Sequence, residues 1–477
     1  MNSPITLIRN VVVDGGTRCH ALIRRGRITR LSHEIADAEL VIDGNGGRLI
    51  PGLVDHHIHL LAAAAALNSF DFGQMPGADA VSFDEKIREL AAIGPVRMIG
   101  YSDDSRPILD RRDLDELSGS VPVRVQYRTG GLWVMNSAAL DLTLVPGSRV
   151  PAEFERDEHD RLTGRVWRGD RFIRNSVRAT APTLEQLGKD LVRWGVTGVT
   201  DASETTTQDQ AAIIAQAAKH FPQRLCLMSG TSLSAAHDAQ FSVGPIKIML
   251  DEHDLPSLDD VISKIGFARS QRRSVAAHCV TPTELAFMIA AFKSAGTLPG
   301  DRSEHGSLIP EDAIPVLKDL KLTVVTQPAF VFTRGDRYLR TVPADQHQDL
   351  YRLNSLVQAD IRVAAGSDAP YGPANPWIAI RAAMDRRTRQ AAPLGEREIV
   401  DLDAAIALYG AMSEKRDRSR QRIQIGMLAD LCLLRADVTW PEEDPVALTL
   451  IGGVVAYLRG NTTISGNLCA PGCAAAR

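Results

Sequence analysis

The stretch at residues 51–60 reads PGLVDHHIHL, and the stretch at residues 366–370 reads GSDAP. The first is a short apolar run with the pattern of a β-strand, and it ends in histidines. Residues two apart on a strand point to the same face, so His57 and His59 can share one metal ion. His56 lies on the opposite face of that strand, where a structural role is the favoured interpretation.

Short apolar runs of this kind recur through the middle of the chain and alternate with helix-patterned segments. After residues 53–60 they lie at 121–128, 195–202, 246–251, 274–280, 301–307, 322–328 and 362–369. Repeated strand–helix units indicate a parallel sheet covered by helices, and eight candidate strands predict a (β/α)8 barrel of the TIM type. Two more strand-like segments, 96–101 and 224–228, find no place in this series and are assigned to insertions or edges.

Both ends of the chain are rich in short strand patterns separated by glycine turns. These patterns lie at residues 5–13, 21–31, 39–42, 426–434 and 449–458. We therefore predict a smaller composite β-domain, built from residues 1–52 and from residues 423–477 with their tail. The barrel domain is expected to occupy residues 53–422.

Composition restricts the class of protein. Hydrophobic residues make up 44% and charged residues 23% of the 477 residues, which is typical of a globular chain. The net charge of −4 gives no sign of a nucleic-acid or anionic-membrane partner. The longest uncharged apolar run, at residues 60–67, is far shorter than the ~20 residues of a membrane span. The six cysteines form no CxxC pair, so we expect a soluble, cytoplasmic protein.

Further metal-ligand residue types follow the later apolar runs. His278, His305 and Asp368 stand at or beside the ends of three of them, where barrel enzymes carry catalytic groups. Imidazoles with a carboxylate are the ligands that Zn²⁺ and similar ions prefer. A bound metal lowers the pKa of water from 15.7 to ~7, and Asp368 is placed to act as the acid/base carboxylate.

Lys247 shares the run at 246–251 with aliphatic residues at positions 246, 248 and 250. If that aliphatic row packs on the surrounding helices, Lys247 points into the barrel. A buried lysine is costly unless it is paired or chemically altered. An ion pair with Asp251 or Glu252 is the alternative.

Taken together, these stretches resemble the amidohydrolase superfamily, specifically amidohydrolase family 3, the YtcJ-like group. The resemblance extends over nearly the whole chain, at residues 51–60, 195–203, 247–251, 277–284, 301–306, 325–328, 366–370 and 426–434. It implies one ion bound by the first two histidines of the series, a second bound by the later two, and a carboxylated lysine that bridges them. The implied ligands are His57, His59, Lys247, His278, His305 and Asp368, with one or two Zn²⁺ ions per chain and a CO2-derived carbamate on Lys247.

The chain also departs from this family. Relatives often carry histidines where this chain has Ser102 and Tyr127. Substrate contacts at these positions are therefore expected to differ, or activity to be altered. Four other side chains are candidate pocket residues, each with a structural role as the alternative: Gln327, Arg128, Trp133 and Tyr338.

The sequence thus predicts a metal-dependent hydrolase that cleaves a non-peptide C–N bond in a small amide, an N-formyl or N-acyl compound, or a cyclic amide. A deaminase, favoured by a single metal and an unmodified lysine, and a lactone or ester hydrolase are alternatives on the same scaffold. A catalytically silent metal-binding homologue is the alternative from another class. The expected partner is a small-molecule substrate, with no nucleic acid and no membrane. The oligomeric state is open, although barrels of this type commonly form homodimers.

Overall fold

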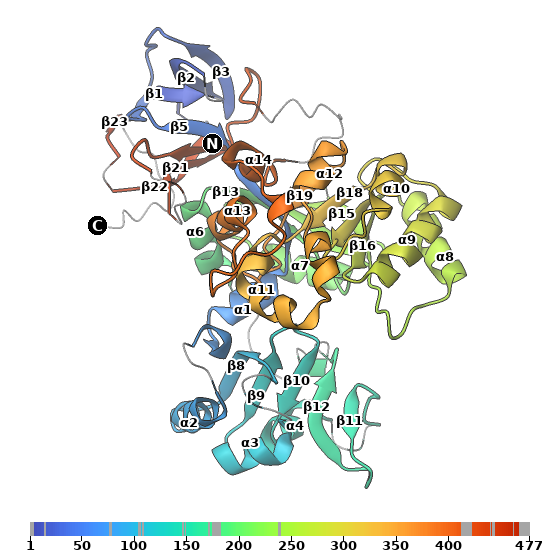
Figure 1. The fold of residues 1–477 in the computed structure, drawn as a ribbon. Helices are drawn as coiled ribbons and strands as arrows, with labels where there is room; N and C mark the ends of the chain where they lie inside the picture. Colours follow the sequence, from blue (N-terminus) through green and yellow to red (C-terminus); the bar gives the residue numbers. More distant parts are fainter. Residues whose placement is uncertain are drawn as a thin grey trace. The chain divides into compact units, whose positions relative to one another are not determined.

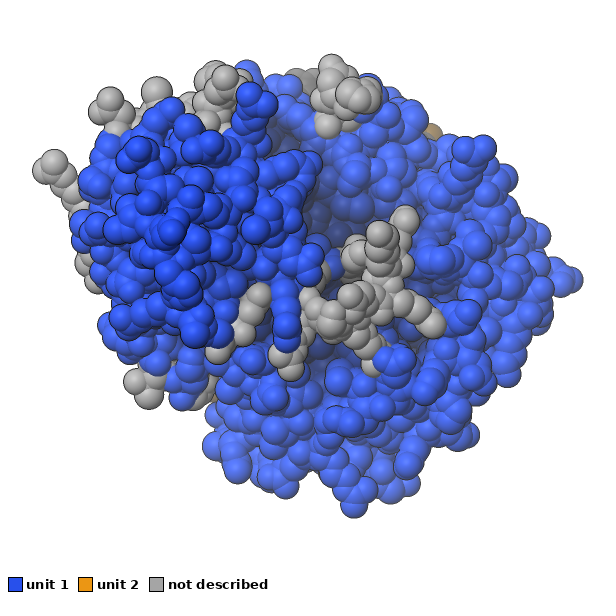
Figure 2. Space-filling view, turned by 90° about the horizontal axis from the view of Figure 1, so that it is seen from above, with its two compact units in different colours: residues 1–60, 183–477 blue, residues 61–182 orange. Residues whose placement is uncertain are grey.

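A computed structural model describes residues 4–13, 16–75, 79–103, 106, 109–145, 147, 149–169, 172–173, 183–236, 240–411, 422–438, 440, 444–460 and 462–466. Figure 1 shows its helices and strands along the chain. The chain forms two compact units. Unit 1 comprises Met1–Leu60 and Thr183–Arg477, and unit 2 comprises Leu61–Pro182 (Figure 2).

In the part of unit 1 that the structure describes, eight parallel strands follow one another in a single sheet. In spatial order they are β6 (Leu53–Ile58), β13 (Val196–Asp201), β14 (Arg224–Ser229), β15 (Phe241–Ile248), β16 (Val275–Cys279), β17 (Arg302–His305), β18 (Thr323–Thr326) and β19 (Arg362–Ala365). Backbone hydrogen bonds join the two outer strands just beyond their carboxyl ends. The His59 N–H donates to the Ala369 carbonyl at 2.9 Å, and the Asp368 N–H donates to the His57 carbonyl at 2.7 Å. The predicted (β/α)8 barrel is confirmed.

Helices precede or follow most of the barrel strands, although the described residues between β14 and β15 contain none. They are α6 (Glu185–Arg193), α7 (Gln208–Ala217), α8 (Leu258–Ser270), α9 (Pro282–Ala295), α10 (Ala313–Asp319), α11 (Ala329–Thr341), α12 (Asn354–Gln358), α13 (Pro376–Asp385) and α14 (Leu402–Ala407). Helix α9 shows how the sequence sets such a start: Thr281 and Glu284 form a reciprocal capping box, and Pro282 takes the first turn.

Two of the predicted strand positions were wrong. The run at 121–128 is not a barrel strand; it forms β9 (Val123–Tyr127) in the sheet of unit 2. The segment at 224–228, predicted to lie in an insertion or at an edge, forms β14 and is the third barrel strand. Strand β15, which carries Lys247, is therefore still the fourth.

The register of β15 follows the predicted alternation. Ile246 and Ile248 pack in one apolar cluster with Val261 and Ile265 of α8. Because side chains alternate along a strand, Lys247 points to the opposite face, towards the barrel interior. Its side chain is only 2% exposed.

A second sheet in unit 1 draws strands from both ends of the chain. Its strands are β1 (Thr6–Val13), β2 (Arg18–Arg24), β3 (Arg27–Ser32), β4 (Leu40–Asp43), β5 (Arg48–Pro51), β20 (Leu431–Leu434), β21 (Val446–Ile451), β22 (Val454–Leu458) and β23 (Ile464–Gly466). Strand β5 pairs antiparallel with β20, which joins the two ends, and Ile8 and Leu433 share one buried cluster. The domain boundaries after residues 52 and 422 stay a prediction, and the tail at 467–477 lies outside the described residues.

Unit 2 contains a sheet with helices packed on it. The sheet has the order β11 (Phe154–Arg156), β12 (Leu162–Trp167), β10 (Leu132–Met135), β9, β8 (Val96–Tyr101) and β7 (Phe70–Asp71). The accompanying helices are α2 (Ala80–Ala91), α3 (Arg111–Ser118) and α4 (Ser137–Thr143), and α1 (Leu60–Ala66) precedes them in the chain. None of the helices within the described ranges has the length and apolar character that crossing a bilayer requires.

Candidate metal centre

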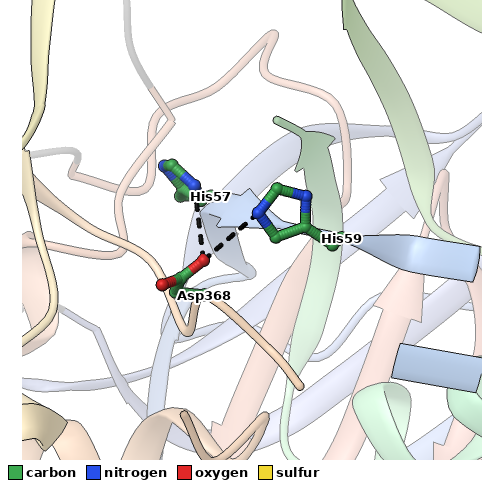
Figure 3. A group of neighbouring side chains, drawn as sticks. All are labelled: His57, His59 and Asp368. Atoms are coloured by element: carbon green, nitrogen blue, oxygen red, sulfur yellow. Dashed lines mark ion pairs between the residues drawn. The ribbon is translucent and has the colours of Figure 1, made fainter. Parts of the chain in front are cut away.

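Three side chains converge at the carboxyl ends of the first and last barrel strands (Figure 3). The Nε2 atom of His57 lies 3.5 Å from Oδ1 of Asp368, and Nε2 of His59 lies 3.3 Å from the same oxygen. One ligand atom from each residue falls within 4.8 Å of the others. Oδ1 of Asp368 is buried and has no hydrogen-bond partner among the described residues. Two imidazole nitrogens and an unsatisfied carboxylate oxygen are a donor set that fits a divalent cation.

Strained backbone and a buried carboxylate fix this arrangement. Asp368 has φ +53° and His305 has φ +68°, a left-handed conformation that few residues other than glycine adopt. Oδ1 of Asp55 accepts the backbone N–H groups of His57 and Ser367, each at 3.0 Å. Asp55 thus ties the first strand to the loop that carries Asp368, and burial raises its pKa to about 6.

The later histidines of the predicted set lie beside the first. The ring centroids of His57 and His305 are 4.7 Å apart, and those of His305 and His278 are 4.4 Å apart. Burial lowers the pKa of His305 to about 3 and that of His57 to about 4. Both imidazoles are therefore neutral at pH 7, which is the form that binds metals.

Lys247 lies in the same charged neighbourhood. It interacts electrostatically with Glu304, Arg302 and Asp368, and its Nζ has no hydrogen-bond partner among the described residues. Burial lowers the pKa of its ammonium group. The predicted ligands His57, His59, His278, His305 and Asp368 thus adjoin one another, and Lys247 faces them from β15.

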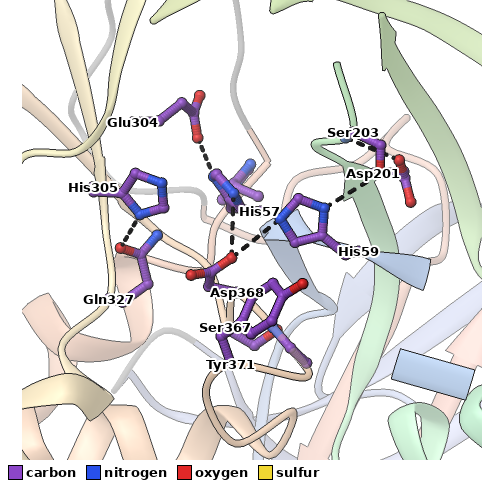
Figure 4. Close-up of polar contacts among 12 residues, drawn as sticks. His57, His59, Asp201, Ser203, Glu304, His305, Gln327, Ser367, Asp368 and Tyr371 are labelled. Atoms are coloured by element: carbon purple, nitrogen blue, oxygen red, sulfur yellow. Dashed lines mark hydrogen bonds and ion pairs between the residues drawn. The ribbon is translucent and has the colours of Figure 1, made fainter. Parts of the chain in front are cut away.

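Glu304 and Arg302 belong to this centre, although neither was predicted. The carboxylate of Glu304, fully buried, contacts Nδ1 of His57 (Figure 4). It also forms an ion pair with Arg302. Burial acts to raise the pKa of Glu304, but Arg302, Lys247 and His57 outweigh it and hold that pKa well below its usual range. Arg302 also donates to the backbone carbonyl of His56 at 3.1 Å. His56 itself bonds through Nε2 to the Gly410 carbonyl, which agrees with a structural role.

His59 and His305 are oriented by further neighbours. Nδ1 of His59 lies 3.2 Å from the Ser203 hydroxyl, and the Ser203 N–H donates to Asp201 at 3.1 Å. Nδ1 of His305 lies 3.0 Å from Oε1 of Gln327, a residue with no exposed surface. Gln327 thus contacts a histidine of the cluster through Oε1, and its role as a substrate contact stays a prediction.

The other candidate pocket residues lie on other elements. Tyr338 lies on α11, and its hydroxyl hydrogen bonds to that of Tyr351 at 2.8 Å. Arg128 and Trp133 belong to unit 2, where Trp133 is 3% exposed and lies beneath the guanidinium of Arg97. Their roles in substrate binding stay predictions, as do the effects of Ser102 and Tyr127 in the same unit.

A parallel eight-stranded barrel with histidines and an aspartate gathered at its carboxyl strand ends defines a metal-dependent hydrolase. The chain matches the amidohydrolase family over residues 40–457, and it belongs to that family. Membership of this family confirms the predicted class of enzyme, a hydrolase that acts on carbon–nitrogen bonds.

Individual relatives are distant and cover almost the whole chain. The chain is 25% identical to the N-substituted formamide deformylase of Arthrobacter pascens, over 94% of this chain and 96% of the relative. It is 23% identical to the putative amidohydrolase YtcJ of Bacillus subtilis (strain 168), over 91% and 93%. Among solved structures, an uncharacterised metal-dependent hydrolase from Pyrococcus horikoshii OT3 matches with a TM-score of 0.69 and 18% identity, over 91% of this chain and 98% of the other.

Proposed function

We propose that this protein hydrolyses the C–N bond of a small non-peptide amide, with N-formyl and N-acyl compounds as the first class to test. A divalent cation, with Zn²⁺ as the expected ion, would be held by His57, His59 and Asp368, and a second by His278 and His305. The similarity to an N-substituted formamide deformylase supports this substrate class.

One observation carries the proposal: in three histidines of the cluster, Nδ1 makes a polar contact with another side chain of the protein. The partners of Nδ1 are Glu304 for His57, Ser203 for His59 and Gln327 for His305. Nε2 is thereby the ring nitrogen that each histidine has left to bind a metal ion. For His57 and His305 the neighbour of Nδ1 is a carboxylate or carbonyl oxygen, which is the usual partner of the second nitrogen in a metal-bound histidine.

When bound, the cation would supply the Lewis acidity that lets water attack an amide at neutral pH. Asp368 is the chain's own acid/base. Burial acts to raise its pKa, but the neighbouring histidines hold that pKa far below its usual range, so it is an anion at pH 7. It can accept the proton of the attacking water and deliver it to the leaving nitrogen.

Hydrolysis of a panel tests this function directly. Protein purified without chelators would be assayed for metal content and for release of formate or amine from N-formyl amines, N-acetyl amines and cyclic amides. We expect turnover that disappears on chelation and returns with added Zn²⁺. Ammonia release from aminated heterocycles alone would show a deaminase instead. No turnover of any compound by metal-loaded protein would favour the catalytically silent alternative.

We also propose that Lys247 is carboxylated when metal is bound. A neutral amine is the form that reacts with CO2, and burial favours that form of Lys247. Native mass spectrometry in bicarbonate would show one CO2 adduct on metal-loaded wild type and none on Lys247→Met. An unmodified mass at full metal occupancy would contradict the proposal.

A further inference from the structure

Arg334 lies at the same end of the barrel as the candidate metal centre. Helix α11 begins at Ala329, shortly after the carboxyl end of β18, and Arg334 is in its second turn. Its Nη2 donates to the Tyr371 carbonyl at 2.9 Å, in the loop that follows β19. The guanidinium thus joins the helix that follows β18 to the loop that follows β19.

Tyr371 connects Arg334 to the centre. The Tyr371 N–H donates to the Asp368 carbonyl at 2.8 Å, and its ring packs edge-on against the ring of His59, with 5.6 Å between centroids. Figure 4 shows Tyr371 beside Asp368 and His59. One residue therefore separates the guanidinium from two of the candidate metal ligands.

The hydrogen bonding of Arg334 differs from that of the structural arginines in unit 1. Arg386 donates to three backbone carbonyls, and Arg273 donates to three carbonyls and a serine hydroxyl. Arg352 pairs with two carboxylates. Arg334, by contrast, makes one hydrogen bond and no ion pair within the described part of the chain, so most of its five N–H donors stay available.

The plane of this guanidinium is nevertheless fixed. It lies over the ring of Phe330, with 3.5 Å from its central carbon to the ring centroid, and Phe330 is 2% exposed. The side chain of Arg334 is itself partly buried. A partly desolvated, planar cation with free donors is suited to bind a carboxylate in a bidentate manner.

We propose that Arg334 is a specificity residue that binds an anionic group of the substrate, such as a carboxylate on the part of the molecule away from the scissile C–N bond. The inference deepens the proposed function and rests on it. It narrows the substrate class from small amides in general to N-acyl or N-formyl compounds that carry a carboxylate, N-acylated amino acids among them. The remaining donors of the guanidinium would pair with the two carboxylate oxygens.

Binding of two ligands to four proteins, all loaded with metal, tests this role. Phenylacetate and phenylacetamide have nearly the same shape and differ in charge. Their dissociation constants would be measured by calorimetry for wild type, Arg334→Gln, Arg334→Lys and the control Arg340→Gln, an exposed arginine of the same helix. If phenylacetate binds through the metal and not through Arg334, its dissociation constant should be nearly the same in all four proteins. A selective effect of the Arg334 substitutions is therefore due to the guanidinium.

We expect Arg334→Gln to weaken phenylacetate binding at least about tenfold and phenylacetamide binding less than about twofold. The affinity of Arg334→Lys for phenylacetate should lie between those of wild type and Arg334→Gln, because lysine keeps the charge but lacks the paired N–H donors of the guanidinium. Equal effects on both ligands, or no binding of phenylacetate by wild type at roughly 10 mM, would overturn the inference. Binding is measured separately from hydrolysis. If the proposed amidase function is wrong but the role of Arg334 is right, the selective loss of phenylacetate binding will be seen although N-formylphenylalanine is not hydrolysed.

Discussion

Replacing Glu304 by glutamine tests whether the buried charges around His57 serve folding stability alone or also metal binding. Glu304 is completely buried between Arg302 and Nδ1 of His57. Glutamine keeps the shape of the side chain but removes its charge, which leaves the Arg302 guanidinium, itself 2% exposed, without its carboxylate. Breaking a buried ion pair from one side typically costs 3–5 kcal/mol of folding stability. We expect about 3 kcal/mol here, because the amide oxygen can still accept a hydrogen bond.

The same change should weaken metal binding. Without the carboxylate, His57 is a less basic ligand and its Nδ1–H tautomer is less firmly held. Loss of such a supporting partner typically lowers metal affinity 10–100-fold. Competition with a chromogenic chelator measures the affinity, and urea unfolding of the metal-free protein measures the stability.

Asp301→Asn is the matched control, since Asp301 is fully buried and lies just before the start of the same strand. It pairs with Arg269 at 2.6 Å and accepts backbone N–H groups from Val275 and Leu298. We expect a similar loss of stability with unchanged metal affinity. If Glu304→Gln binds Zn²⁺ within about twofold of wild type while losing stability as the control does, Glu304 is a purely structural residue and our reasoning about His57 is refuted.

Three other predictions follow from the centre. Asp368→Asn should abolish turnover and leave metal bound; full activity in this variant, assayed beside its metal content, would exclude the acid/base role. Removal of metal by chelation should lower the midpoint of thermal unfolding, and added Zn²⁺ should restore it, since a ligand that binds only the native state stabilises it. In metal-free protein, burial lowers the pKa of His56 and of His57 to about 4, below the ~6.5 of an unfolded histidine. The unfolded chain therefore binds more protons between these values, and the free energy of unfolding should fall as the pH drops from about 6.5 towards 4. The loss is on the order of 2 kcal/mol per histidine at pH 5 in urea titrations, partly offset by Asp55, whose pKa is raised to about 6.

The barrel was predictable because several of its strands combine a short apolar pattern with metal-ligand residue types at their ends. The two errors in strand placement arose where only the pattern was available. Residues 121–128 and 224–229 are both short, alternating and apolar, and such a pattern does not reveal which sheet a strand joins. A signal was nonetheless present: β9 and β10 are separated only by residues 128–131, which include Gly130 with φ +81°. So short a connection suits an antiparallel hairpin, whereas parallel strands need a long crossover.

Glu304 was missed for a different reason. Successive side chains of a strand point to opposite faces, so the pattern places Glu304 on the face opposite to its neighbour His305. Ligands of one metal site are expected on the same face, which excluded Glu304. The left-handed backbone at His305 breaks that alternation, and no sequence pattern predicts it. Arg302 and Glu304 do give a signal of their own, since two opposite charges at i and i+2 of a central barrel strand share a face and must be paired when buried.

The charges that face Lys247 link the metal content of the site to the chemical state of this lysine. With Lys247 protonated, Lys247 and Arg302 balance Glu304 and Asp368 in a buried environment. A divalent cation adds two positive charges, which a site of low dielectric constant tolerates only if they are offset. Deprotonation of Lys247 offsets one of them, whereas its conversion from ammonium to carbamate offsets both. A single divalent ion together with a carboxylated Lys247 therefore restores the balance, and a second ion would need two more negative charges from outside these four side chains. Metal stoichiometry and carboxylation are consequently one question, which is answered only when both are measured on the same sample.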